Sequence, residues 1–117
     1  MAYGGNFYAI VPIERVNIEF KRENGQKFLD LGLQISDAIN EQNRPVHPEY
    51  PDIAICHHID FITPGDQGPL HWRNAMAIHP GWFDRSPCGT GTSARLAQMV
   101  ARDEFSDGDV LINESWI

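Results

Sequence analysis

The chain has 117 residues, of which 42% are hydrophobic, and its three Trp and six Phe supply enough bulky material for the core of one modest domain. Its formal net charge is −7 and its nine basic residues are scattered, which argues against nucleic acid or an anionic membrane as a partner. No apolar run reaches membrane-spanning length, so we expect a cytoplasmic protein whose two cysteines remain free thiols.

The first half of the chain predicts two strands and one helix. Residues 6–11 are rich in aromatic and branched side chains, as in a buried strand, and residues 16–20 alternate between apolar and polar, as in a half-buried strand. Over residues 26–42 the apolar side chains fall on one helical face, which predicts an amphipathic helix whose Gly32 permits close packing. Three prolines in residues 43–51 then predict an extended connector.

The second half of the chain predicts three further strands and one further helix, namely strands at 52–62, 72–79 and 110–113 and a helix after Cys88. In the long strand at 52–62, His57 shares a face with isoleucines, as a core histidine would, whereas His58 lies on the more polar face. This order of elements suits an α+β domain in which a curved, mostly antiparallel sheet wraps a central helix.

Cys88 lies between a proline and the sequence Gly-Thr-Gly-Thr, directly before the second predicted helix. The free amides and the dipole of a helix N-terminus stabilise a thiolate and also bind an anion such as a carboxylate. We therefore predict that Cys88 is a general acid/base and that the backbone N–H groups of Gly89 and Thr90 bind a substrate carboxylate. Asp84 is predicted to bind a substrate ammonium group. The alternatives are a buried structural cysteine and a turn-capping aspartate.

The sequence also offers residues for three other kinds of site. Cys56, His58 and Asp60 occupy alternate positions and could bind a metal, but no paired ligand spacing accompanies them, so we expect neither a metal nor any other cofactor. A cysteine phosphatase needs Arg six positions after its cysteine, where this chain has Ala94, with Arg95 one position too late. A Cys-His hydrolase remains open, although no spacing selects it.

Three stretches resemble the proline racemase family, which includes 4-hydroxyproline 2-epimerases and trans-3-hydroxyproline dehydratases. They are Asp84-Arg-Ser-Pro-Cys-Gly-Thr-Gly-Thr-Ser-Ala94, which resembles the second catalytic-cysteine motif of the family, Ala2-Tyr-Gly-Gly-Asn-Phe-Tyr-Ala-Ile-Val11, and Ile112-Asn-Glu-Ser115. The resemblance implies the diaminopimelate epimerase fold, in which two pseudo-symmetric, barrel-like halves each enclose a helix and the active site lies between them. It also implies that Asp84 binds the substrate's amino group and His58 another polar group of the substrate.

The activity implied by this resemblance is cofactor-independent epimerisation or racemisation at the α-carbon of 4-hydroxyproline or proline. Such a reaction needs a base on one face of that carbon, an acid on the other, and donors that hold the carboxylate as charge builds on it. A cysteine at position 88 favours an epimerase or racemase over a dehydratase. The stretch around Trp72 and Arg73 resembles hydroxyproline epimerases more than proline racemases.

The family uses two cysteines, one in each half, and this chain lacks the first motif, which is of the Met-Pro-Cys-Gly-His type. Cys56 does not replace it, because no glycine-flanked helix terminus adjoins it. We therefore expect residues 1–117 to form one domain equivalent to the second half, truncated at both ends. Two hypotheses follow: half of an epimerase, which needs the missing half or forms a homodimer, and a non-catalytic domain that binds small carboxylates or an inactive remnant.

Overall fold

The structure, a computed structural model, describes all 117 residues as six β-strands, two α-helices and two short 3-10 helices. In chain order these elements are β1 (Ala2–Tyr3), β2 (Phe7–Pro12), η1 (Ile13–Arg15), η2 (Arg22–Asn24), α1 (Gly25–Gln42), β3 (His58–Pro64), β4 (His71–Ile78), β5 (Trp82–Phe83), α2 (Gly89–Ala101) and β6 (Ile112–Ser115). Neither α-helix combines the length and the hydropathy that a membrane-spanning segment requires.

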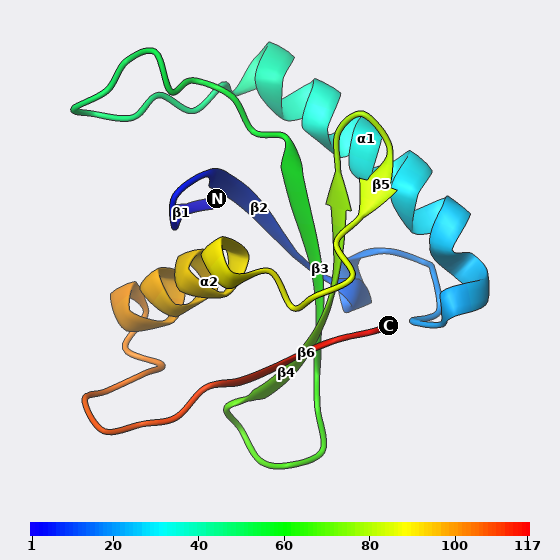
Figure 1. The fold of residues 1–117 in the computed structure, drawn as a ribbon, viewed down its shortest axis with the longest axis vertical. Helices are drawn as coiled ribbons and strands as arrows, with labels where there is room; N and C mark the ends of the chain where they lie inside the picture. Colours follow the sequence, from blue (N-terminus) through cyan, green and yellow to red (C-terminus); the bar gives the residue numbers. More distant parts are fainter.

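All six strands belong to one sheet, in which β1 to β5 follow one another and β6 also pairs with β4 (Figure 1). Three of the pairings are antiparallel, whereas β2 with β3 and β4 with β6 are parallel. Helix α1 lies in the crossover between β2 and β3, since parallel neighbours cannot be joined by a tight turn. The prediction of an α+β domain is confirmed, with a sheet in which antiparallel pairings outnumber parallel ones by three to two.

The two helices lie on opposite faces of the sheet (Figure 1). Alternate residues of each strand point to opposite sides, so each helix packs against a different set of side chains. The buried residues on the side of α1, which we call the α1 face, are Ala9, Phe28, Cys56, Ile59, Phe61, Ala75, Ala77 and Trp116. The clustered buried apolar residues on the side of α2, the α2 face, are Tyr8, Met76, Cys88 and Ala94. The two cysteines therefore lie on opposite sides of the sheet.

Aromatic rings fill the α1 face. The ring of Phe28 lies 5.0 Å from that of Phe61 and 5.5 Å from that of Trp116, measured between centroids. Gly32 permits the close approach of α1 that the sequence predicts, because a Cβ at this position would lie 2.7 Å from the Cβ of Ala77. This face has eight clustered buried residues against four on the side of α2, so it holds the larger part of the apolar core.

Two of the predicted strands are wrong or too long. Residues 16–20 form no strand, because their alternate apolar side chains pack against the α1 face from a loop without a strand partner. Residues 52–57 are also outside the sheet, since the backbone N–H and C=O of Cys56 bond to the side chain of Asn40 rather than to a neighbouring strand. The connector predicted at 43–51 therefore continues to residue 57, and the last strand begins two residues later than predicted.

Candidate active site

Cys88 is the N-cap residue of α2, held by a chain of hydrogen bonds that begins at Asp84. The carboxylate oxygen Oδ1 of Asp84 accepts hydrogen bonds from the amide of Ser86 at 2.9 Å and from its hydroxyl at 2.8 Å. The Ser86 hydroxyl oxygen in turn accepts a bond from the amide of Cys88 at 3.0 Å. This turn fixes the backbone of Cys88, which adopts φ 62° and ψ 101° and leaves the residue only 8% exposed.

The first turn of α2 presents free backbone donors beside this thiol. The first bond of the helix joins the amide of Thr92 to the carbonyl of Cys88 at 2.8 Å, so the preceding amides have no acceptor within the helix. Gly89 and Thr90 are exposed, and a Cβ built at Gly89 would meet nothing within 4 Å. A carboxylate can therefore approach these amides closely, as the sequence predicts.

The carbonyl of Pro87, just before the cysteine, accepts bonds from three elements. Asn74 of β4 donates to it at 3.0 Å, the hydroxyl of Thr92 at 3.2 Å, and Asn113 of β6 at 3.4 Å. Asn113 also donates to the Thr92 hydroxyl at 2.9 Å. The stretch Ile112–Ser115 thus contributes to the site through Asn113, which braces the cysteine loop against the sheet.

Asp60 lies beneath this brace and is fully buried on β3. Its Oδ1 accepts a bond from Asn74 Nδ2 at 3.0 Å, while its Oδ2 and Asn74 Oδ1 have no partner. Burial raises the pKa of Asp60 to about 7, against the lowering effect of the bond from Asn74 and the charge of Arg95. A proton on Asp60 Oδ2 would turn this oxygen into a hydrogen-bond donor, which the unpaired Asn74 Oδ1 could accept.

Glycines allow the surrounding elements to approach the thiol closely. A Cβ at Gly4 would lie 2.2 Å from the carbonyl oxygen of Thr90, so the turn after β1 packs directly on the start of α2. A Cβ at Gly91 would lie 2.6 Å from the terminal methyl carbon of Met76 and 3.1 Å from the Cys88 sulfur. The Tyr-Gly-Gly sequence therefore helps to shape the site although it carries no reactive group.

Tyr8 is a site residue that the sequence reasoning missed. Its hydroxyl oxygen lies 3.5 Å from the Cys88 sulfur and 2.5 Å from the hydroxyl oxygen of Thr90, and the residue is only 1% exposed. Burial and the hydrogen bond with Cys88 raise the pKa of Tyr8 to about 12. The only sequence signal was its place within Ala2–Val11, and nothing local distinguishes this tyrosine from a core aromatic residue.

His58 and Asp84 lie near the same thiol. The ring of His58 is 4.9 Å from that of Tyr8, with which it pairs across the parallel register of β2 and β3. Burial lowers the pKa of His58, as does neighbouring His57, while Asp84 acts in the opposite direction. Burial tends to raise the pKa of Asp84, but hydrogen bonds from Ser86 and Cys88 and the charge of His58 bring it below its ordinary value. Near neutral pH the site therefore holds a neutral imidazole and an anion.

Two other sequence interpretations change. His57 is not a core histidine, because it is only half-buried and its ring stacks on that of His79 at 4.5 Å. Cys56 belongs to the α1 face, donates weakly to the carbonyls of Phe7 and His58 at 3.7 Å, and has its pKa raised by burial. The alternate spacing proposed for a metal is not realised, since residue 56 is outside the strand and no group of three potential ligands forms.

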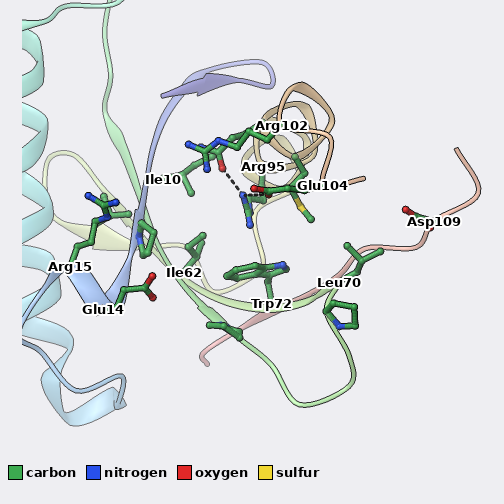
Figure 2. Close-up of a pocket in the computed structure, with 16 residues that line it drawn as sticks. Ile10, Glu14, Arg15, Ile62, Leu70, Trp72, Arg95, Arg102, Glu104 and Asp109 are labelled. Carbon is green, nitrogen blue, oxygen red and sulfur yellow. Dashed lines mark hydrogen bonds and ion pairs between the residues drawn. The ribbon is translucent and has the colours of Figure 1, made fainter. Parts of the chain in front are cut away.

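A cavity of about 980 Å³ lies at the other end of α2, and none of the predicted site residues lines it (Figure 2). Arg95 points into this region, where its guanidinium lies 4.4 Å from the centre of the Trp72 ring and 3.8 Å from a carboxylate oxygen of Glu104. The arginine of the second helix thus belongs to a different part of the molecule from the thiol.

The fold and this site define a class: an α+β domain that presents one thiol at a helix N-terminus beside unpaired amides and an aspartate. Residues 1–117 match the proline racemase family over their whole length, and the chain belongs to this family. The resemblance predicted from three short stretches is thereby confirmed.

Individual relatives agree with this assignment. The chain is 60% identical over 117 residues to the 4-hydroxyproline 2-epimerase of Streptosporangium roseum. The match covers 100% of this chain and 35% of that protein. The chain is 38% identical, with the same coverage, to a probable 4-hydroxyproline 2-epimerase of Rhizobium meliloti. The chain therefore spans about a third of the length of these curated relatives.

Two solved structures share the fold. A hydroxyproline epimerase from Agrobacterium vitis with bound trans-4-hydroxy-L-proline has a TM-score of 0.89 at 33% identity, over 97% of this chain and 32% of that one. A probable proline racemase from Agrobacterium radiobacter with bound carbonate has a TM-score of 0.90 at 36% identity, over 98% of this chain and 33% of that one.

Proposed function

We propose that residues 1–117 supply one of the two proton-transfer groups of a cofactor-independent 4-hydroxyproline 2-epimerase, and that Cys88 is that group. The observation that carries this proposal is a thiol at the N-cap of α2 beside amides that have no acceptor in the helix. The names of the relatives support 4-hydroxyproline as substrate, with proline as the second candidate. We place the reaction in the cytoplasm, where free thiols persist.

In the proposed reaction the Cys88 thiolate takes the α-proton, so that an S–H bond forms as the Cα–H bond breaks. The electron pair moves into the carboxylate, where the amides of Gly89 and Thr90 donate to the oxygens that gain charge. Asp84, an anion near neutral pH, binds the ring ammonium, and neutral His58 binds another polar group of the imino acid. A second acid then protonates the opposite face of Cα, which inverts its configuration.

This chain's other thiol is not suited to be that second acid, because Cys56 lies on the α1 face with the sheet between it and Cys88. We therefore propose that the second group comes from outside residues 1–117, either from the other half of a family protein or from a second copy in a homodimer. In this proposal residues 1–117 are one domain, equivalent to the second half of the family fold.

The test is α-proton exchange in D₂O, followed by NMR, with trans-4-hydroxy-L-proline and L-proline as substrates. We expect the 117-residue chain to incorporate deuterium at Cα even where the second acid is absent, because the Cys88 thiolate can remove the α-proton and return a deuteron to the same face. Cys88→Ser should lose this exchange, and Cys56→Ser should keep it. Exchange that persists in Cys88→Ser, or that disappears equally in both variants, would contradict the assignment. A stronger exchange with L-proline would change the substrate but not the chemistry.

A second candidate function is binding of small carboxylates without turnover. It is favoured by the exposed amides of Gly89 and Thr90 together with the single thiol on this face. The two functions separate in one experiment, an NMR titration of the ¹⁵N-labelled chain with the same imino acids. Shifts at these amides without deuterium incorporation would replace the enzyme with a binding domain.

A further inference from the structure

The hydroxyl of Tyr8 lies between two other groups of the site. It is 2.5 Å from the Thr90 hydroxyl oxygen and 3.5 Å from the Cys88 sulfur, whereas Thr90 and the sulfur are 3.9 Å apart. All three groups come from different structural positions, namely strand β2, the N-cap of α2 and the first turn of α2. Their order in space is therefore Thr90, Tyr8, Cys88.

A thiolate can only accept hydrogen bonds, so the nearest hydroxyl must turn its proton toward the sulfur. Tyr8 is the nearer of the two hydroxyls, and Thr90 can then donate to the oxygen of Tyr8. When the sulfur carries a proton, the same chain can reverse, with the thiol donating to Tyr8 and Tyr8 to Thr90. Tyr8 keeps its own proton throughout the neutral range, because its pKa is raised to about 12.

We infer that Thr90 and Tyr8 form a reversible hydrogen-bond chain that ends on Cys88 and stabilises its thiolate each time the sulfur gives up a proton. Tyr8 is thus a positioning and tuning residue for the thiol, assigned from its contacts and not from the family motif. This inference rests on the proposed role of Cys88 in proton transfer. In this hydrogen-bond chain Thr90 contributes its side-chain hydroxyl as well as its backbone amide.

Other ionisable groups face this cluster and act on the sulfur independently of the chain. The ring of His58 on β3 lies 4.9 Å from that of Tyr8 in a tilted arrangement, and Asp84 precedes the cysteine in the same loop. Both have their own pKa shifts, so a change in pH alone does not isolate Tyr8. Removal of single hydroxyl groups does isolate it, because His58 and Asp84 remain in place.

The experiment is the pH profile of alkylation of Cys88 by iodoacetamide, with each cysteine quantified by peptide mass spectrometry. Tyr8→Phe removes only the hydroxyl and keeps the packed ring. We expect it to move the alkylation midpoint upward by about 1 pH unit, a tenfold lower thiolate fraction, as for the loss of a hydrogen bond to a charged group. Tyr3→Phe is the matched control, because Tyr3 packs against Phe7 and His47 away from the thiol. Superimposable profiles for Tyr8→Phe and the unmodified chain would overturn the inference.

The exposed Thr90 gives a second test should Tyr8→Phe prove unfolded by circular dichroism. Thr90→Val removes the hydroxyl and should give a smaller upward shift of the midpoint, and Thr90→Ser should restore it. Equal alkylation midpoints for these two variants would show that the Thr90 hydroxyl is not part of the hydrogen-bond chain, which would contradict the inference. Alkylation needs no substrate, so a shifted profile without any α-proton exchange would reject the proposed function alone.

Discussion

The two faces of the sheet are built from the same strands and differ in what their residues do. On the α1 face, alternate residues such as Ile59 and Phe61 form an aromatic and aliphatic cluster, and Cys56 is one more apolar member of it. On the α2 face, the neighbouring residue Asp60 supports a polar network that leads to Cys88. The comparison teaches that the environment, not the residue type, separates the apolar thiol of Cys56 from the thiol to which we assign proton transfer.

Each cysteine lies beside an asparagine, and the two asparagines bond to the backbone in different ways. Asn40 bonds both the amide and the carbonyl of Cys56 at 2.9 Å, and thereby closes a backbone segment that has no strand partner. Asn113 bonds the loop that carries Cys88, but it leaves the amides after the cysteine free. One asparagine side chain thus pairs the backbone groups of Cys56, whereas the other holds the loop of Cys88 and leaves the amides after it unpaired.

The largest expected effect tests whether the α1 face carries the stability. Phe28→Ala empties the centre of the aromatic cluster, and we expect it to lower the free energy of unfolding by about 3 to 5 kcal/mol, measured by urea denaturation. Val100→Ala, at an exposed position of α2, is the control and should change stability by less than about 0.5 kcal/mol. A cost for Phe28→Ala similar to that of the control would break the comparison.

A pH-dependent effect of similar or smaller size tests the α2 face. Because the folded state raises the pKa of Asp60 from 3.8 to about 7, its contribution to stability is fully present below pH 3.8 and is lost as pH rises through 7. Asp60→Asn cannot titrate, so its stability relative to the unmodified chain should increase from pH 4 to about 7 and then level off. The full rise corresponds to on the order of 4 kcal/mol. Urea denaturation at several pH values measures it, and a pH-independent difference would contradict it.

The smallest expected effect sharpens the contrast between the two asparagines. Asn40→Ala and Asn113→Ala should each lower the free energy of unfolding by about 1 to 2 kcal/mol, because each leaves backbone or hydroxyl groups without a partner. Only Asn113→Ala should also change the rate at which iodoacetamide alkylates Cys88, since of these two asparagines only Asn113 bonds to the cysteine loop. Equal alkylation rates in both variants would show that the brace does not act on the thiol.

The sequence predicted those parts of the fold whose signals are local. The helix expected at 26–42 forms as α1, and the glycine-rich turn after Cys88 begins α2. The strand expected at 16–20 was wrong because alternation reports burial on one side and not the presence of a strand partner. The strand expected at residues 52–57 was wrong for a related reason, since the side chain of Asn40 on α1 takes the place of a partner strand. Neither contact is visible before the tertiary structure is formed.

The candidate site divides in the same way. Cys88, Gly89 and Thr90 were predicted because a helix N-terminus has a recognisable sequence, and the structure gives them the predicted free amides. Tyr8 could not be predicted from its own surroundings, because its contact with the thiol joins residues 80 positions apart. The buried pair of Asp60 and Asn74 depends likewise on the antiparallel pairing of β3 with β4.

The backbone of Cys88 has a further consequence for how this domain could change under selection. Its φ of 62° lies in the left-handed region, which costs a residue with a side chain on the order of 1 kcal/mol or more and costs glycine almost nothing. Cys88→Gly would therefore relieve the strain of the turn at the same time as it removes the thiol. At this position greater stability favours glycine, whereas the proposed proton transfer requires cysteine, so the two demands favour different residues.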